Sequence, residues 1–187
     1  MIKNKVDYLY YLTEDKKRLG SFSRPYWEWF NKSERWYIWL FIRNLRKVEY
    51  LQNTNTSLFR KILHRIQLIR FYRIMHKTQI YIYPNVVGPG LCIPHLGYML
   101  ISSVAEIGKN FTVRPGVVIA SNLGTTNSKI RKVIIGDNVE LSAGCYILCK
   151  KIGNNVSIGA NAVVMKNIPD NHIAFGNPAE LYPKPIQ

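Results

Sequence analysis

The chain has 187 residues, of which 47% are hydrophobic and 20% are charged, and this composition excludes an intrinsically disordered protein. Its formal net charge of +15 is uneven, because residues 1–79 carry 17 Lys and Arg against 6 Asp and Glu, whereas residues 80–187 carry 9 against 5. Such a charge favours nucleic acid, anionic lipid or an acidic substrate as a partner, and it does not choose among them.

The cysteines and the start of the chain indicate the cellular compartment. Cys92, Cys145 and Cys149 form no paired metal motif, so we expect reduced thiols and no metal site, which is typical of a cytoplasmic protein. The first residues carry charges throughout and contain no apolar core of a cleavable signal. The longest apolar run, residues 36–42, is too short to cross a bilayer, which takes about 20 residues.

Residues 1–78 are predicted to form a basic helical region. In residues 33–52 and 57–77, apolar side chains recur at steps of three and four residues, the period of an α-helix. Lys and Arg lie between them in the second segment, which predicts an amphipathic basic helix with Thr56 or Ser57 as its N-cap. The polar residues 53–56 predict a turn between the two helices.

Three roles are open for this helical region. Its apolar stripe can pack against the rest of the chain or against sister subunits of a trimer, with the charges solvated. It can lie on a membrane surface, where aromatic and basic side chains settle at lipid headgroups. The residues that suit a membrane surface are Trp36, Tyr37, Trp39, Phe41, Arg43, Arg46 and Lys47. It can also attract an acidic polysaccharide, whereas nucleic acid is not expected, because no known binding module is present.

Residues 79–187 follow a different pattern, in which an aliphatic residue returns every six positions. The residues in this register are Ile101, Ile107, Val113, Ile119, Ile135, Leu141, Ile147, Ile152, Ile158 and Val164. A period of six predicts a parallel β-helix with three faces and about 18 residues per coil. A β-sandwich is the alternative, but its alternating strands would not keep this phase. The predicted fold class is therefore mainly β, preceded by an α-helical N-terminal region.

Two segments interrupt the register and are candidate functional sites. Residues 120–133 are polar and rich in Gly, Asn and Thr, so we expect them to loop out of a coil. Residues 85–100 also depart from the period, and they contain His95. Irregular segments on a rigid scaffold commonly carry binding and catalytic residues.

Recognisable motifs occur within residues 79–181. They are GPGLCIPHLG at 88–97, IGKNF at 107–111, IGDNV at 135–139, and IGANAVV at 158–164, which leads into IPDN and GNPA. Together they resemble the hexapeptide-repeat acyltransferases, in the serine acetyltransferase branch that includes acetyltransferases of capsule and exopolysaccharide synthesis. The resemblance implies a left-handed β-helix, a homotrimer, and acetyl-CoA bound in the groove between neighbouring subunits.

The resemblance also implies that His95 is the catalytic base. Acetyl transfer from a thioester needs a base for the acceptor hydroxyl and donors for the developing oxyanion, and imidazole titrates near neutrality. The hydroxyl oxygen would attack the acetyl carbonyl directly, with backbone N–H groups of the coil as the oxyanion donors. The other histidines are interpreted as helix surface residues (His64 and His76) and as part of the terminal turn (His172).

Acetyl-CoA is implied to lie along coil corners that carry small residues. The matching positions in this chain are Ser121, Ala143 and Ala160. Small residues at these positions also permit tight turns, and the two roles are compatible. Lys166 would meet a phosphate of CoA as a point charge, or it is a solvated surface lysine.

Departures from the serine acetyltransferase motif favour a sugar as the acceptor. Pro94 stands where those enzymes carry an acidic residue, and the following loop lacks their second histidine. Lys132 would take the slot of that histidine, and Arg131 would take the place of the arginine that holds the carboxylate of serine. Because the acidic partner for the amino group of serine is missing, we expect a sugar hydroxyl as the acceptor. His95 then needs another orienting group, either a backbone carbonyl or Glu106.

Three functions follow from these observations. The main expectation is acetyl-CoA-dependent O-acetylation of a sugar hydroxyl in surface-polysaccharide synthesis. The first alternative is serine O-acetylation for cysteine biosynthesis. The second alternative is a non-catalytic β-helix used for assembly or binding. We expect residues 1–78 to be the basic helical region and residues 79–187 to be the acetyltransferase domain.

Overall fold

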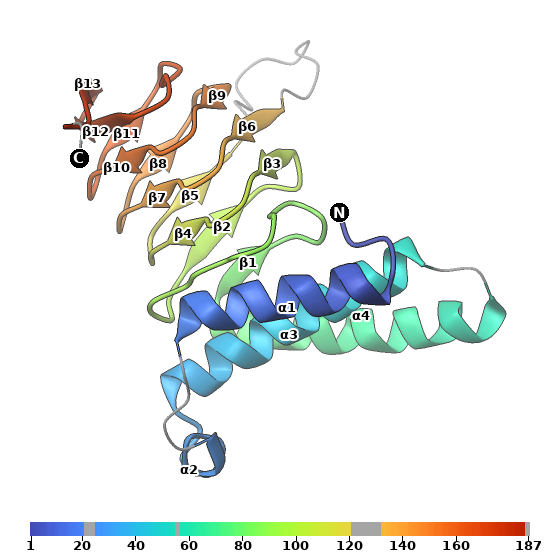
Figure 1. Ribbon diagram of the computed structural model, residues 1–187. Coiled ribbons are helices and arrows are strands. Elements are labelled where there is room, and N and C mark those ends of the chain that lie inside the picture. The colour runs from blue at the N-terminus through green and yellow to red at the C-terminus, as the bar shows by residue number, and fades with distance from the viewer. Residues whose placement is uncertain (21–24, 55–56, 121–131, 186–187) are drawn as a thin grey trace.

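The structure is a computed structural model that describes residues 1–20, 25–54, 57–120 and 132–185. The helices form a layer at one end of a coil of short strands (Figure 1). They are α1 (Lys5–Leu19), α2 (Pro25–Phe30), α3 (Glu34–Asn53) and α4 (Leu58–Thr78). The last two confirm the helices predicted over residues 33–52 and 57–77. None of the described helices combines the length and the hydropathy that crossing a bilayer requires.

Serine side chains cap the two long helices α3 and α4. Ser33 Oγ accepts the backbone N–H of Trp36 at 3.2 Å, and Ser57 Oγ accepts that of Arg60 at 3.3 Å. Each cap satisfies an amide that has no partner within its helix, which stabilises a helix by about 1 kcal/mol. Ser57 is therefore the N-cap of α4, one of the two residues expected in that place.

The strands form three faces of a coil. Face A contains β1 (Ile80–Ile82), β2 (Met99–Ile101), β5 (Val118–Ile119), β8 (Tyr146–Ile147) and β11 (Val163–Val164). Face B contains β3 (Ala105–Ile107), β6 (Val133–Ile135) and β9 (Lys151–Ile152). Face C contains β4 (Thr112–Val113), β7 (Glu140–Leu141), β10 (Ser157–Ile158) and β12 (His172–Gly176), with β13 (Ala179–Pro183) antiparallel at its edge. The chain visits faces A, B and C in turn, so each strand pairs in parallel with its equivalent one coil away.

The interior of the coil is filled by the aliphatic residues of the six-residue register. All ten of them are buried, with at most 7% of each residue exposed. They stack in register along a face, as Ile101, Ile119, Ile147 and Val164 do on face A. Each stacked side chain covers apolar surface of its equivalents in the neighbouring coils, and this burial stabilises the coil. The predicted β-helix is confirmed.

Asparagines make the turns between face B and face C. Asn110, Asn138, Asn155 and Asn171 adopt left-handed backbone conformations, with φ between 54° and 58°. Asparagine tolerates this conformation better than most residues. Their side chains also bond between coils, since Asn110 Nδ2 donates to Asn138 Oδ1 at 2.9 Å and Asn155 Nδ2 donates to Asn171 Oδ1 at 2.8 Å. The repeated asparagine of the IGKN, IGDN and IPDN motifs therefore has a structural role at this corner.

The helical layer closes the N-terminal end of the coil. Phe41 and Leu45 of α3 and Phe71 of α4 are fully buried, and they belong to the same hydrophobic cluster as the coil interior. Phe41 and Phe71 place their ring centroids 5.7 Å apart. The inner sides of α3 and α4 thus pack against this chain's own coil, where they cover its first strands, including Ile80.

Candidate active site

The segment from residue 85 to residue 98 leads from the helical layer to His95. Its backbone is held by Asp15 of α1, whose Oδ1 accepts the N–H groups of Gly90 and Leu91 at 2.8 Å each. Gly90 has φ = +86°, a conformation that residues with a side chain rarely adopt. Cys92 then pairs in parallel with Thr112 of β4. The segment therefore forms an irregular first coil between the helical layer and the regular coils.

A buried ionic cluster fixes the start of this segment. Arg46 of α3 is fully buried, and it donates to Asp15 Oδ2 at 2.8 Å and to Glu49 Oε2 at 3.0 Å. It also donates to the carbonyl oxygens of Val87 at 2.8 Å and Gly88 at 2.7 Å. Burial acts to lower the pKa of Arg46, but the carboxylates of Glu49 and Asp15 outweigh it and raise that pKa. The cluster ties α1, α3 and the segment that carries His95 into one unit.

His95 meets a carboxylate from the helical layer. Its Nδ1 lies 3.6 Å from Oε2 of Glu34, and the backbone N–H of Leu96 donates to Oε1 of Glu34 at 2.6 Å. The His95 side chain is 67% exposed and that of Glu34 is 48% exposed, so the pair is open to solvent. With Nδ1 facing a carboxylate, Nε2 is the ring nitrogen left to accept a proton from a substrate. An imidazole oriented in this way is suited to general base catalysis.

Local sequence places Glu34 beside this histidine. Glu34 is the first residue of α3, directly after the N-cap Ser33. A carboxylate is favoured in the first turn of a helix, where the amide dipoles present positive charge. Glu34 was not predicted from the sequence, because its contact with Leu96 spans 62 residues. The only local signal was that a Ser-Glu pair begins a helix.

Glu106, one of the two orienting groups considered for His95, lies elsewhere. It is on β3 of face B, and its carboxylate forms an ion pair with Lys132, directly before β6. The carboxylate that lies beside His95 is that of Glu34. The difference arises because a carboxylate near in sequence was considered, whereas the fold brings one from α3.

Small residues stack at the corner between faces C and A, which we call the C–A corner. It is made by residues 94–98, 114–117, 142–145 and 159–162 of successive coils. Gly144 donates its N–H to the carbonyl of Pro115 at 3.0 Å, and Asn161 donates to that of Ala143 at 2.9 Å. A Cβ on Gly97 would lie only 2.9 Å from Cβ of Pro115, so these turns pack closely. The structure therefore aligns the turn of His95 with the turns of Ala143 and Ala160.

The other residues of the predicted site lie at different distances from His95 and at different corners of the coil. Ala143 and Ala160 are exposed at the C–A corner, roughly 10 Å and 14 Å along the coil axis from the turn of His95 if coils repeat at strand spacing. Lys166 is exposed in the turn after β11, at the corner between faces A and B, and so lies apart from the two alanines. Ser121 and Arg131 lie outside the described residues, as does most of the expected 120–133 loop.

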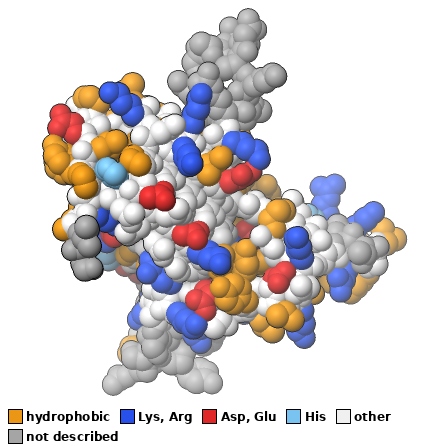
Figure 2. Space-filling model, turned by 45° about the horizontal axis from the view of Figure 1, so that its top comes forward, with side chains coloured by type: hydrophobic (Ala, Val, Ile, Leu, Met, Phe, Trp, Pro, Cys, Tyr) orange, Lys and Arg blue, Asp and Glu red, His pale blue; other side chains and the backbone are white. Residues whose placement is uncertain are grey.

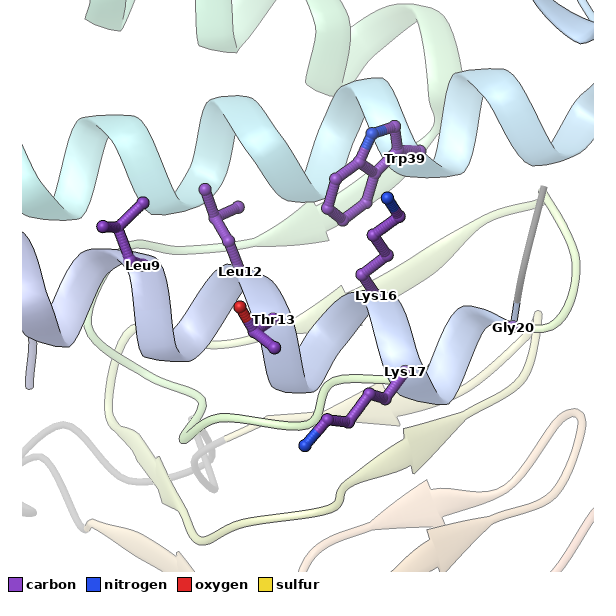
Figure 3. Close-up of a pocket in the computed structure, with 7 residues that line it drawn as sticks. All are labelled: Leu9, Leu12, Thr13, Lys16, Lys17, Gly20 and Trp39. Carbon is purple, nitrogen blue, oxygen red and sulfur yellow. The ribbon is translucent and has the colours of Figure 1, made fainter.

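A hollow in the helical layer does not contain the predicted site residues. It has a volume of about 490 Å³ and lies on α1 and α3 (Figure 3). Its lining residues are Leu9, Leu12, Thr13, Lys16, Lys17, Gly20 and Trp39. In the described part of the chain, no three His, Cys, Asp or Glu side chains gather as ligands of a metal ion would. The candidate chemistry therefore centres on His95 and Glu34.

The chain is similar to known serine acetyltransferases in sequence and in structure. No protein-family model matches it. A serine acetyltransferase of Mycobacterium tuberculosis (strain ATCC 25618 / H37Rv) is 35% identical over 113 residues, which are 59% of this chain and 48% of that protein. The chain spans about half the length of the curated relatives it matches.

Solved structures show the same architecture over almost the whole chain. The soybean serine acetyltransferase apoenzyme has a TM-score of 0.71 at 22% identity, covering 95% of this chain and 70% of that one. A serine acetyltransferase in complex with CoA has a TM-score of 0.70 at 19% identity, covering 95% of this chain and 71% of that one. The chain shares their left-handed β-helix. The similarity includes the helical layer, since 95% coverage extends well beyond the coil.

These comparisons correct the main functional expectation. The relatives and the structures are named serine acetyltransferase, so the expected sugar acceptor in surface-polysaccharide synthesis was wrong, and the serine alternative is the better supported one. The physical reason is the place of the carboxylate. The expectation required an acid next to His95 in the sequence, at Pro94, but the structure provides Glu34 from α3.

Proposed function

We propose that the chain is an acetyl-CoA-dependent acetyltransferase that acetylates the hydroxyl group of serine. The observation that carries the proposal is the exposed pair of His95 and Glu34 on a left-handed β-helix. A curated relative that is 35% identical is named serine acetyltransferase, and a similar solved structure is titled as a CoA complex.

His95 is the proposed general base. Glu34 orients the imidazole through Nδ1, so that Nε2 accepts the proton of the serine hydroxyl as its oxygen attacks the acetyl carbonyl. The C–S bond of the tetrahedral intermediate then breaks, and the imidazolium returns the proton to the departing sulfur of CoA. The products are O-acetylserine and CoA, and no acyl-enzyme forms. Backbone N–H groups of the C–A corner are the proposed donors to the oxyanion.

Charge near His95 supports an acceptor with an amino group. A primary ammonium binds favourably near a carboxylate, and a sugar hydroxyl gains less from such a charge. Glu34 supplies this carboxylate, and its side chain stays 48% exposed. Lys132 and Arg131 remain the proposed contacts for the carboxylate of serine, although Lys132 pairs with Glu106 within this chain.

The C–A corner is the proposed track of acetyl-CoA. Ala143 and Ala160 are small and exposed, so an extended pantetheine arm can lie against the backbone at their turns. Ser121 belongs to the same proposal. Lys166 remains a proposed contact for a CoA phosphate, at a corner distinct from that of the two alanines.

Face A is the proposed trimer contact. Its outward residues form an apolar ladder across five coils, whereas face B presents Glu106, Ile134 and Lys151. The ladder consists of Tyr81, Leu100, Val118, Tyr146 and Val163. A contiguous apolar surface favours association with another subunit. Because face A borders the C–A corner, a neighbouring subunit on it would form one wall of a groove beside His95.

The proposal is tested by release of CoA thiol from acetyl-CoA with serine and with a panel of sugars. We expect turnover with serine. The variant His95→Ala should lower kcat by at least about 100-fold, because the base is removed. The matched control is His172→Ala, a histidine of β12 that should leave the rate unchanged. Turnover with sugars but not serine would refute the acceptor, and full activity of His95→Ala would refute the mechanism.

A further inference from the structure

The first three turns of α4 expose an apolar stripe on the side turned away from the coil. The residues of this stripe and their exposed fractions are Leu58 (75%), Phe59 (69%), Ile62 (52%), Ile66 (60%) and Ile69 (55%). They recur at steps of three and four residues, so they form one continuous surface along the helix. We call this surface the outer face of α4. In Figure 1 this part of α4 projects beyond the strands of the coil.

The opposite side of α4 already has its packing partners. Phe71 and Met75 are buried in the core, and Gln67 donates to Asn44 of α3 at 2.7 Å. The exposed stripe is therefore a second apolar surface, beyond the one that the fold of the chain uses. Exposing several large aliphatic side chains to water is unfavourable, which is typical of a surface that binds a partner.

Positive charge accompanies the outer face of α4. The 21 residues of the helix contain no Asp or Glu, and its basic residues are Arg60, Lys61, Arg65, Arg70, Arg73 and Lys77. Arg65 lies three positions after Ile62, and Arg70 lies four positions after Ile66, so they are neighbours of the stripe on the helix surface. Figure 2 shows Lys and Arg beside hydrophobic side chains at the projecting end of the molecule.

Four of the six acidic side chains in residues 1–79 have partners away from the outer face of α4. Asp15 and Glu49 are buried against Arg46, Glu14 pairs with Lys17, and Glu34 meets His95. A second copy of the chain placed on the outer face of α4 would bring another row of Lys and Arg against the first. Like charges at such short range oppose association. Charge complementarity therefore requires an anionic partner, and the stripe requires an apolar one.

We propose that the outer face of α4 docks on the surface of a membrane that contains anionic lipids. The isoleucine stripe enters the boundary between headgroups and acyl chains, while the arginines and lysines contact lipid phosphates. A lipid surface offers both features at once, whereas an acidic polysaccharide offers no apolar layer for the stripe. The helix lies on the membrane and does not cross it.

The structure moves this role from α3 to α4. The aromatic residues of α3 that suited a membrane surface are largely covered, since Phe41 is fully buried and Trp36 and Trp39 are half-buried. Arg46, part of the same set, lies inside the ionic cluster. The first turns of α4 carry exposed side chains of both required kinds, which the α3 set does not.

The proposal is tested with the full chain and two kinds of vesicle, phosphatidylcholine alone and phosphatidylcholine mixed with phosphatidylglycerol. Flotation should recover the chain with the anionic vesicles only, and added salt should weaken this binding. The triple variant Arg65→Gln, Arg70→Gln, Arg73→Gln should bind on the order of 100-fold more weakly, since each basic residue near the surface contributes about 1 kcal/mol. The triple variant Ile62→Ser, Ile66→Ser, Ile69→Ser should bind at least about 10-fold more weakly.

Matched controls separate the outer face from the overall charge. Changing Lys109, Lys150 and Lys151 of the coil to Gln removes the same charge from exposed positions and should weaken binding far less. Because vesicle binding is measured without acetyl-CoA, its outcome is independent of the proposed function. Equal losses for the two charge variants would overturn the proposal. The proposal would also be overturned if the chain bound no vesicles and formed oligomers that the isoleucine variant does not form. That result would identify a second copy of the chain as the occupant of the outer face of α4.

Discussion

Glu34 approaches His95 at a distance that suits an orienting role. The variant Glu34→Gln keeps the shape of the side chain and removes its charge, so the imidazole loses its partner at Nδ1. We expect kcat for serine acetylation to fall by about 10- to 100-fold, with KM for acetyl-CoA little changed, since misplacement of a catalytic group affects the chemical step. Steady-state kinetics measures both constants.

Two further variants distinguish orientation from stability. Glu34→Asp retains the carboxylate and should recover part of the lost kcat. Glu14→Gln changes a half-buried carboxylate of α1 that forms an ion pair with Lys17, and it should leave kcat unchanged. A fall in kcat for Glu14→Gln as large as that for Glu34→Gln would contradict the assignment.

Arg46 is the residue on which the ionic cluster depends. The variant Arg46→Ala leaves the buried carboxylates of Asp15 and Glu49 without their cation, and we expect the free energy of unfolding to fall by about 3–5 kcal/mol. Urea unfolding followed by circular dichroism measures this change. The control is Arg43→Ala, an exposed arginine of the same helix, which should change stability by less than about 0.5 kcal/mol. Similar losses for both variants would contradict the role of the cluster.

Buried thiols make stability depend on alkaline pH. Burial raises the pKa of Cys145 to about 12 and that of Cys149 to about 11. Between about pH 9 and pH 11 the unfolded chain loses thiol protons that the folded chain retains, so the free energy of unfolding falls as pH rises. The variant Cys145→Ala should reduce this slope by about 1.4 kcal/mol per pH unit. Urea unfolding at several pH values measures it, and the two curves should run parallel below about pH 8.

At the scale of elements, the regular parts of the chain could be predicted and the contacts between them could not. The six-residue register of Ile101, Ile119 and Ile147 specifies stacking by itself, because each residue meets its equivalent one coil away. The long helices α3 and α4 follow from their local period, whereas α1, with Asn4 as its N-cap, was expected only as part of a helical region. The pairing of Glu34 with His95 depends on how the helical layer sits on the coil, which no local pattern encodes.

Face A gives a prediction about assembly. Tyr146 on face A and Ile134 on face B are both 46% exposed in the single chain, so they form a matched pair. The variant Tyr146→Asp should dissociate the proposed trimer, because a charge would enter an apolar contact. Ile134→Asp should leave the trimer intact. Sedimentation velocity measures both, and a trimer that survives Tyr146→Asp but not Ile134→Asp would place the interface on face B.

At the scale of the whole molecule, the helical layer and the coil share one hydrophobic cluster. Phe41 and Phe71 belong to it together with Ile101 and Leu141 of the coil. Since apolar burial is continuous across the junction between α4 and β1, we expect the two parts to unfold together. In the sequence, the helical period gives way to the six-residue register near residue 78. The hydrophobic core continues across this point.

The origin of the Glu34 carboxylate has a consequence for how such a protein can change. Inside the coil of strands, each side chain packs against the equivalent side chains of the coils before and after it, so a substitution there disturbs its neighbours. The first turn of α3 stands outside that stack and yet contacts the imidazole of His95, the proposed base. A substitution at this one helix start can therefore alter the choice of acceptor or the rate of acetylation, while the coil of repeats keeps its shape.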